Sequence, residues 1–301
     1  MPMPNLSDPG WSGPGQPYPS QTDPGQTNPG RSDPDRSRLV LIPSYDTGPR
    51  LLQTVREACA AWAPVWVVVD GSTDGSDVLL REAMGDDPGF RLIALPANGG
   101  KGAAVLAGLR LAAAEGFRQA LVMDADGQHP AASIGAFMAA AAAAPDALIL
   151  GRPVFGADAP LLRVRGRRIS NWWANLETLG AGIGDSLFGF RVYPIAPLLR
   201  VMQRHRWMRR FDFDPEAAVR LAWAGVPLVN LPAPVRYLRP AEGGVSHFRY
   251  GRDNLLLTWM HMRLVCGMLP RLPRLFTRRL IARRLRRPPR DATGLPPATR
   301  R

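Results

Sequence analysis

Short runs of apolar, largely β-branched residues recur along the chain, and helix-compatible stretches separate them. The apolar runs cover residues 39–42, 65–69, 91–95, 120–123 and 147–150, and the stretches between them cover roughly 49–62, 76–84, 100–115 and 131–144. The runs begin about 26 to 29 residues apart, which is the spacing of βα units that feed a mainly parallel sheet. The pattern therefore predicts a Rossmann-like α/β fold whose sheet is flanked by helices.

Three further elements are expected in the second half of the chain. The sequence predicts an aromatic, basic helix around residues 168–179, a strand at 188–193, and a helix over 214–224 that Gly225 ends. We expect these elements to complete one folded domain over residues 38–250.

The two ends of the chain differ from this domain in composition. Residues 1–37 contain 14 Pro or Gly, so they lack the apolar surface that folding requires, and we expect a disordered tail. Residues 251–290 are predicted to form a helical extension, first apolar and then Arg-rich, and 291–301 a second disordered tail. In the extension, Leu272, Leu275, Phe276 and Leu280 follow the spacing of one helical face.

The positive charge of the chain is concentrated at its C-terminus. The whole sequence has 38 Lys+Arg against 25 Asp+Glu, a net charge of +13, but residues 263–301 carry 12 arginines and one acid, Asp291. The preceding residues are therefore close to neutral. This distribution argues against nucleic-acid binding over the folded surface and favours contact of residues 270–290 with an anionic membrane surface. A solvated basic tail is the alternative.

The two cysteines and the apolar runs limit the class of protein further. Cys59 and Cys266 are too few for a disulfide framework or a cysteine-based zinc site, and their apolar neighbours predict buried thiols. The N-terminus lacks a basic segment followed by an apolar run, and no uncharged stretch is long enough to span a membrane. We expect a cytoplasmic protein that is peripheral on the inner face of the cell membrane.

Two carboxylates follow the fourth apolar run, at Asp124 and Asp126, with Gln128 close behind. Parallel sheets bind ligands beyond the carboxyl ends of their strands, and oxygen ligands of this kind suit Mg²⁺ or Mn²⁺. The sequence therefore predicts a site for a divalent cation and a substrate phosphate. A turn that caps the next helix is the structural alternative.

Two more strand ends carry candidate binding residues. Asp70 follows the second run, where it can accept hydrogen bonds from a ligand, and Gly71 permits a close approach. Residues 72–74 are also ordinary turn and cap residues. Lys101 is the only lysine of the chain and follows a glycine-rich stretch at the start of an expected helix, a place that suits an anion.

Taken together, these residues resemble the family-2 inverting glycosyltransferases, and most closely their dolichyl- or polyprenyl-phosphate sugar transferase branch. The resemblance extends from Leu39 to about Tyr250. It is carried by Ile42-Pro43-Ser44-Tyr45, Asp70-Gly71-Ser72-Thr73-Asp74, residues 98–102 and 124–130, Asp185 with Gly189-Phe190-Arg191, Phe213-Asp214-x-Glu216, and Gly225…Pro232.

The resemblance implies a GT-A-type fold that binds a nucleotide-diphosphate sugar. It implies that Pro43, Tyr45 and Asp70 hold the base and ribose, with Lys101 also on the nucleotide sugar. Asp124 would lie near the ribose and the metal, while Asp126 and Gln128 would bind the Mg²⁺ or Mn²⁺ that carries the diphosphate. A divalent cation stabilises the negative charge that develops on such a leaving group.

The resemblance also points to residues for the acceptor. Asp185 would orient or deprotonate the acceptor, Glu216 is the rival acid, and Arg191 would make an anionic contact. A helix or turn cap is the structural alternative for Asp185, and a lipid phosphate acceptor needs no base. Arg239 and His247 match a phosphate-contacting loop and are expected to bind the nucleotide sugar, with His247 at a place that relatives often give to lysine.

We thus expect transfer of a sugar from a nucleotide-diphosphate sugar to a lipid-linked acceptor, either a polyprenyl phosphate or a lipid hydroxyl. The expected partners are these two substrates and an anionic membrane surface, with no nucleic acid. A nucleotidyltransferase is the first alternative, although Pro43-Ser44-Tyr45 is not the glycine-rich, basic loop that it requires. A non-catalytic nucleic-acid-binding protein is the second.

Overall fold

A computed structural model of the protein describes residues 37–155, 161–235 and 250–285. Residues 1–36 of the predicted tail at 1–37 lie outside these residues, as do the predicted tail at 291–301 and the site candidates Arg239 and His247.

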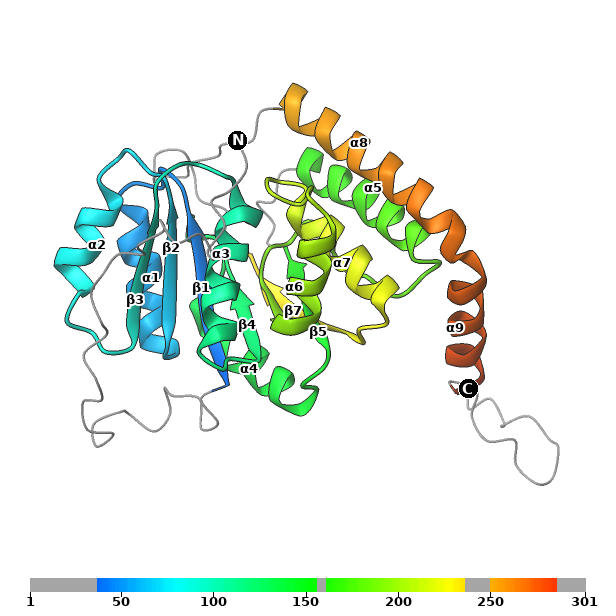
Figure 1. Cartoon of the computed structure of the whole chain (residues 1–301), viewed down its shortest axis with the longest axis horizontal. Helices are drawn as coiled ribbons and strands as arrows, with labels where there is room; N and C mark the ends of the chain where they lie inside the picture. The colour runs from blue at the N-terminus through cyan, green and yellow to red at the C-terminus, as the bar shows by residue number, and fades with distance from the viewer. Residues whose placement is uncertain (1–36, 156–160, 236–249, 286–301) are drawn as a thin grey trace.

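A sheet of seven strands forms the centre of the described part of the chain, in the order β3-β2-β1-β4-β6-β5-β7 (Figure 1). The strands are β1 Arg38–Ser44, β2 Val65–Asp70, β3 Phe90–Leu95, β4 Gln119–Val122, β5 Leu148–Val154, β6 Arg191–Pro194 and β7 Leu228–Pro234. Strands β1 to β4 pair in parallel, as do β5 and β7, whereas β6 is antiparallel to both of its neighbours. The predicted α/β fold with a mainly parallel sheet is confirmed.

Helices cover both faces of this sheet. They are α1 Arg50–Ala61, α2 Ser76–Met84, α3 Lys101–Ala114, α4 Ile134–Ala143, α5 Leu161–Glu177, α6 Ile195–Arg204, α7 Phe213–Ala224, α8 Tyr250–Met268 and α9 Leu272–Leu285, with 3₁₀ turns η2 Ala131–Ser133 and η4 Leu269–Arg271. Successive side chains of a strand point to opposite faces. Leu39 and Leu41 accordingly pack with α3, α6 and α7, while Val40 and Ile42 pack with α1, α2 and α4.

The strand β6 is shorter than the sequence predicts, because it begins at Arg191 rather than at residue 188. The Asp185 carboxylate accepts hydrogen bonds from the backbone N–H groups of Leu187 (2.9 Å) and Phe188 (2.7 Å). These bonds hold the preceding residues in a turn. Helix α5 begins earlier than expected, at Leu161.

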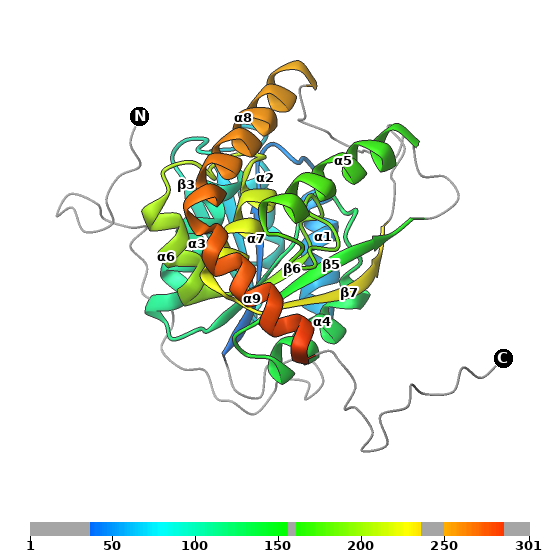
Figure 2. The ribbon, with the colours of Figure 1, turned by 90° about the vertical axis from the view of Figure 1, so that its right-hand side faces the viewer.

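The predicted extension packs on the core of the domain. Met260, Leu264 and Met268 of α8 are buried in the same cluster as Leu275 of α9, and the two helices follow one another across the side of the molecule that faces the viewer in Figure 2. The expected apolar face of α9 is divided, since Phe276 and Leu280 are exposed.

The two thiols differ from each other. Cys59 is buried as predicted, but Cys266 is exposed, so the expectation of two buried thiols is wrong for Cys266. Helix α8 presents only part of its circumference to the core, and an apolar neighbourhood in sequence does not specify which side a residue takes. Among the described helices, none combines the length and the apolar character that crossing a bilayer requires.

Candidate active site

A cavity of about 1190 Å³ opens at the carboxyl ends of β1, β2 and β4. Parallel strands bring their carboxyl ends to one edge of the sheet, which is why residues far apart in the sequence meet here. Of the residues singled out in the sequence, the cavity is lined by Pro43, Tyr45, Asp70, Lys101, Asp124, Asp126 and Gln128.

The loops that follow β1 and β2 are tied together beside this cavity. The Asp46 carboxylate accepts a hydrogen bond from the Thr73 N–H (2.7 Å), and the backbone N–H of Asp46 donates to the Ser72 hydroxyl (3.0 Å). The Asp74 carboxylate accepts from the Gly48 N–H (2.7 Å). Residues 72–74 therefore serve as turn residues in this structure.

Asp70 anchors the loop that leads from β3 into α3. Its two carboxylate oxygens accept hydrogen bonds from the backbone N–H groups of Gly99 (3.0 Å) and Gly100 (2.6 Å). Burial raises the pKa of Asp70, although these bonds oppose the shift. Gly71 has φ +65°, and a Cβ there would lie 2.5 Å from the Ala97 carbonyl carbon, so only glycine lets the two loops approach.

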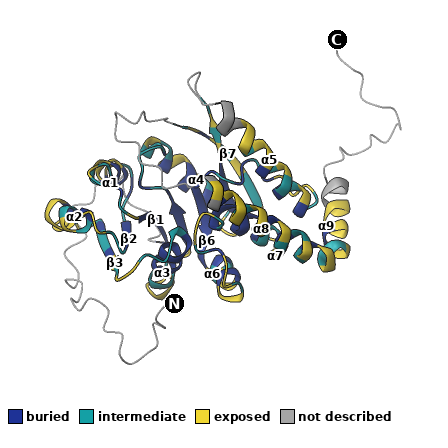
Figure 3. Ribbon diagram, turned by 90° about the horizontal axis from the view of Figure 1, so that it is seen from above, coloured by how far each residue is buried: buried dark blue, intermediate teal, exposed yellow. Residues whose placement is uncertain are grey.

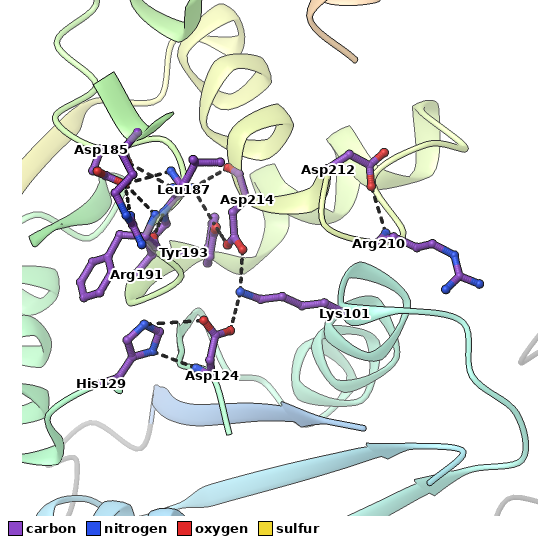
Figure 4. A network of polar contacts seen from close by, with 12 residues as sticks. Lys101, Asp124, His129, Asp185, Leu187, Arg191, Tyr193, Arg210, Asp212 and Asp214 are labelled. Carbon is purple, nitrogen blue, oxygen red and sulfur yellow. Dashed lines mark hydrogen bonds and ion pairs between the residues drawn. The ribbon is translucent and has the colours of Figure 1, made fainter. Parts of the chain in front are cut away.

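Lys101 bridges two carboxylates at the centre of the site (Figure 4). Its Nζ lies 2.5 Å from Oδ1 of Asp124 and 2.5 Å from Oδ2 of Asp214. Burial would lower the pKa of Lys101, but the charges of Asp124 and Asp214 outweigh burial and raise it. For Asp124, burial favours the neutral acid, but the charge and hydrogen bond of Lys101 outweigh it and lower the pKa to about 2. Both groups are therefore charged at neutral pH.

The imidazole of His129 contacts the backbone of Asp124. The Asp124 N–H donates to Nδ1 of His129 (2.9 Å), and the imidazole packs edge-on against Phe188 and Phe190. Burial lowers the pKa of His129, so its ring is neutral at pH 7. The ring thus holds the backbone of the loop that carries the two aspartates.

Asp126 faces the cavity beside Asp124. Its Oδ1 accepts the Gln128 N–H (3.0 Å). Burial and then the charge of Asp124 raise the pKa of Asp126. A cation between the two carboxylates would relieve this repulsion, and Mg²⁺ and Mn²⁺ prefer oxygen ligands of this kind. The oxygen donors of Asp124, Asp126 and Gln128 suit such an ion by their chemistry. The described residues hold no cluster of three or more His, Cys, Asp or Glu arranged around a metal.

Arg191 lies behind the cavity rather than in it. The guanidinium is fully buried and donates to three backbone carbonyls, those of Phe188 (2.8 Å), Asp214 (2.5 Å) and Asp185 (3.2 Å). These bonds join the turn at 185–190 to the first turn of α7, which carries Asp214. The geometry therefore makes Arg191 a support for Asp214 instead of the anionic contact expected from the sequence.

Asp185 is also buried and is not among the residues that line the cavity. Besides the two backbone N–H groups described above, its carboxylate binds Arg167 Nη1 (2.9 Å) and Asn171 Nδ2 (3.3 Å). This arrangement matches the turn-capping alternative.

Glu216 points away from the cavity into a cluster of arginines. It is fully buried and pairs with Arg220 (2.7 Å) on its own helix and with Arg263 (3.0 Å) on α8. Glu216 thereby fastens α8 to α7.

Asp214 and His261 also line the cavity, although the sequence does not identify them as site residues. Asp214 belonged to the Phe213-Asp214-x-Glu216 pattern, but the pattern could not show which carboxylate faces Lys101. His261 of α8 lines the cavity together with Trp173 of α5. A lone histidine in an apolar helix gave no signal of this contact.

The sequence comparison finds the Glycosyl transferase family 2 model over residues 39–206, more than half of the chain. Among solved structures, glucosyl-3-phosphoglycerate synthase from Mycobacterium tuberculosis, determined with Mn²⁺, uridine-diphosphate-glucose and phosphoglyceric acid, is 14% identical. The match covers 83% of this chain and 85% of that one, with a TM-score of 0.51. S. aureus TarS 1–349 in complex with UDP-GlcNAc is also 14% identical, over 78% of this chain and 72% of that chain, with a TM-score of 0.48.

The predicted GT-A-type architecture is confirmed by the seven-stranded sheet together with the family match. Because that match covers the strands β1 to β4 and the loops that form the cavity edge, the chain belongs to glycosyl transferase family 2.

Proposed function

We propose that this protein transfers a sugar from a nucleotide-diphosphate sugar to a lipid-linked acceptor at the cytoplasmic face of the cell membrane. The observation that carries the proposal is the cavity of a family 2 chain in which Asp70, Lys101, Asp124 and Asp126 meet at one sheet edge. Family membership favours this activity over nucleotidyl transfer and over nucleic-acid binding.

The nucleotide is assigned to the part of the cavity beside β1 and β2. Tyr45 is partly exposed there and offers a ring face to a base, with Pro43 beside it. The oxygens of Asp70 keep lone pairs beyond those that accept the Gly99 and Gly100 N–H groups, so they can also accept from a ligand. Arg239 and His247, which lie outside the described residues, remain proposed contacts of the nucleotide sugar.

The metal is assigned to Asp126, Asp124 and Gln128. A divalent cation bound there supplies a Lewis acid that stabilises the developing charge of the nucleoside diphosphate. Lys101 keeps Asp124 ionised and fixes its position, and Asp214 anchors Lys101 from the other side. Arg191 and Asp185 in turn hold the first turn of α7 and the adjoining loop in place.

Apolar side chains exposed on one side of the molecule support the proposed lipid acceptor and the proposed contact with a membrane. Helices α5, α8 and α9 all face the viewer in Figure 2, and Figure 3 marks much of their outer surface as exposed. The large exposed side chains there include Ile169, Trp172, Leu255, Trp259, Phe276 and Leu280. Arg274 and Arg279 are also exposed and lie close in sequence to Phe276 and Leu280. Exposed apolar groups together with cations suit an anionic bilayer surface.

The experiment is a screen for release of nucleoside diphosphate from UDP-glucose, UDP-N-acetylglucosamine, GDP-mannose and dTDP-glucose, with Mn²⁺ or EDTA. We expect one donor to be turned over with Mn²⁺ and not with EDTA. The Asp126→Asn variant should bind the donor but release at least about a hundredfold less diphosphate, a loss of about 2.7 kcal/mol or more of transition-state stabilisation. Asp77→Asn, in the first turn of α2 and not at the cavity, is the matched control. Wild-type turnover by Asp126→Asn would refute the metal assignment.

A further inference from the structure

The cavity extends beyond the sheet edge into a space between α5 and α8, which we call the acceptor arm. Its walls include Ile169 and Trp173 from α5 and Leu257 and Met262 from α8. Sites for single small molecules typically occupy about 300–1,000 Å³, so a cavity of about 1190 Å³ has room for a second substrate beside the nucleotide sugar. The apolar walls suit an acceptor with an apolar body.

A histidine–carboxylate pair stands in this arm, outside the network around Lys101. His261 lines the cavity while its ring is largely buried, and its Nδ1 lies 2.7 Å from Oε1 of the fully buried Glu177. The indole of Trp173 stacks on the imidazole, with ring centroids 5.8 Å apart and planes at 27°. The carbonyl of Glu177 accepts a hydrogen bond from Trp223 Nε1 (2.8 Å). The imidazole is therefore held from two sides.

The pairing determines which nitrogen is available. A carboxylate is a hydrogen-bond acceptor, so Glu177 accepts a hydrogen bond from Nδ1–H of His261, and the lone pair of the neutral ring is then on Nε2. Among the described residues, Nε2 of His261 makes no hydrogen bond. It is not one of the fully buried atoms that lack a partner, so it keeps some exposure. Among the same residues, Oε2 of Glu177 is buried without a hydrogen-bond partner. Burial raises the pKa of Glu177 because its negative charge is removed from water, while the hydrogen bond with His261 opposes the shift. A positive charge on the adjacent imidazole would compensate that charge.

We propose, on the basis of the glycosyl transfer proposed above, that His261 is the general base for a hydroxyl acceptor bound in the acceptor arm, and that Glu177 positions it. The acceptor hydroxyl gives its proton to Nε2, and its oxygen forms the new bond to the anomeric carbon. The bond from that carbon to the diphosphate oxygen breaks, and the electron pair leaves with the nucleoside diphosphate. The resulting imidazolium is stabilised by Glu177 and later releases its proton to water.

The charges that line the arm favour an alcohol over a lipid phosphate. Arg167 is paired with Asp185 (2.9 Å), and the neutral ring of His261 donates its Nδ1–H to Glu177. A phosphate in the arm would therefore meet an arginine whose charge Asp185 already balances and an uncharged imidazole. An alcohol, unlike a phosphate, requires removal of a proton as it attacks.

The carboxylates of Asp185, Asp214 and Glu216 are less suited to this task than His261. Asp185 already accepts from Arg167 and two backbone N–H groups, and Asp214 is bound by Lys101. Hydrogen bonds and ion pairs stabilise the ionised form of a carboxylate and so weaken it as a base. Glu216 is enclosed by Arg220 and Arg263 and has no access to the cavity lining.

The first test uses the full chain with the donor that the screen identifies, and follows release of nucleoside diphosphate with farnesol, with farnesyl phosphate and with neither. The variants are His261→Ala, His261→Gln and Glu177→Gln, with His205→Ala as the matched control because His205 is a histidine that does not line the cavity. We expect farnesol to accelerate release and farnesyl phosphate not to do so.

His261→Ala should lower kcat by about 10²- to 10⁴-fold, the usual contribution of a general base, while the donor Kd measured by calorimetry stays unchanged. Added imidazole should restore part of the rate in His261→Ala but not in His261→Gln, whose side chain fills the space. A 2,2-difluorinated decanol, whose hydroxyl is more acidic, should lose less rate than decanol in the same variant. A merely structural role would produce neither effect.

Imidazole ¹⁵N chemical shifts give a second test that does not depend on turnover. The wild-type chain should show the Nδ1–H tautomer for His261, and Glu177→Gln should weaken that preference. An Nε2–H tautomer in the wild-type chain, or acceleration by farnesyl phosphate that survives in His261→Ala, would overturn the proposal. Absence of turnover with every donor would instead refute the proposed function. The tautomer measurement would still test the pairing of His261 with Glu177.

Discussion

Gly189 lies directly against the ion pair of Lys101 and Asp124. A Cβ at Gly189 would stand 2.5 Å from Lys101 Nζ and 2.7 Å from Asp124 Oδ2. The glycine is therefore required by the space that these two charged groups occupy. The Gly189-Phe190-Arg191 element thus contributes to the site through its smallest residue, which leaves room, and its largest, which supports α7.

Gly189→Ala is expected to disturb the site while leaving the fold intact. The added methyl group meets the ends of two side chains, Lys101 and Asp124, rather than backbone, so we expect a change of about 1 kcal/mol in the free energy of unfolding. Displacement of Lys101 and Asp124 by about 1 Å should lower diphosphate release by about a hundredfold. Gly135→Ala, on α4 with nothing within 4 Å of the added Cβ, is the control. Equal turnover by both variants would contradict the prediction.

Lys101→Met is expected to destabilise the protein because it leaves the carboxylates of Asp124 and Asp214 facing one another without their cation. Breaking a buried pair costs about 3–5 kcal/mol, and the partial exposure of Asp124 places the expected loss near the lower limit. Urea denaturation at pH 7 measures this loss. The double variant Lys101→Met with Asp214→Asn should recover part of it, and a loss that is equal in the single and double variants would show that the pairing is not responsible.

Glu216→Gln should affect stability far more than donor binding. The substitution leaves Arg220 and Arg263 beside a neutral amide, and we expect a loss of about 3 kcal/mol or more in the free energy of unfolding. The donor Kd, measured by calorimetry below the unfolding transition, should stay within about twofold of wild type. A stable variant with abolished turnover would instead restore Glu216 as a catalytic acid.

The sheet and its ligand edge could be predicted from the sequence because both follow from local signals. Apolar runs of strand length define β1 to β4, and the polar residues that follow them must meet where parallel strands end. The cavity-lining positions of Asp70, Lys101 and Asp126 follow from this rule alone.

The roles of Arg191, Glu216 and His261 could not be predicted in the same way. Whether Arg191 faces the cavity or the turn at 185–190 depends on the antiparallel placement of β6 between β4 and β5, which strand spacing does not specify. The partners of Glu216 and His261 come from packing between α7 and α8 and between α5 and α8, pairs separated by 47 and 84 residues. Helical periodicity identifies apolar faces but not which helix a face meets.

Replacement of Phe276 and Leu280 by Asp should reduce membrane binding. Both side chains are exposed on α9, whereas Leu272 and Leu275 of the same helix pack on the core, so the double substitution spares the fold. We expect a loss of at least about tenfold in cosedimentation with vesicles that contain roughly 30% anionic lipid. The reason is that each apolar side chain buried in the bilayer contributes about 1.5–3 kcal/mol. Val78→Asp, at an exposed position of α2, is the control. Equal binding by both variants would remove the membrane assignment.

His205 should make the stability of the protein depend on pH in the mildly acidic range. Burial, and then the charges of Arg220 and other nearby arginines, lower the pKa of His205 to about 4, while Arg220 Nη1 lies 2.9 Å from its Nε2. At pH values between the ordinary pKa of about 6.5 and this lowered pKa, His205 binds a proton in the unfolded chain but not in the folded chain. The free energy of unfolding must then fall as the pH is lowered through this window.

His205→Gln removes this titration and is expected to flatten the dependence. Because the side chain of His205 is only half-buried, the difference in slope between wild type and variant should stay below the limit of about 1.4 kcal/mol per pH unit for one proton. Urea denaturation at pH 7.0, 6.0 and 5.0 (about one pH unit apart) measures it, and above pH 7 the two slopes should coincide. His129 is present in both chains, so its own lowered pKa cancels from the comparison. Parallel curves at all three values of pH would show that His205 binds its proton equally well in the folded and unfolded chains.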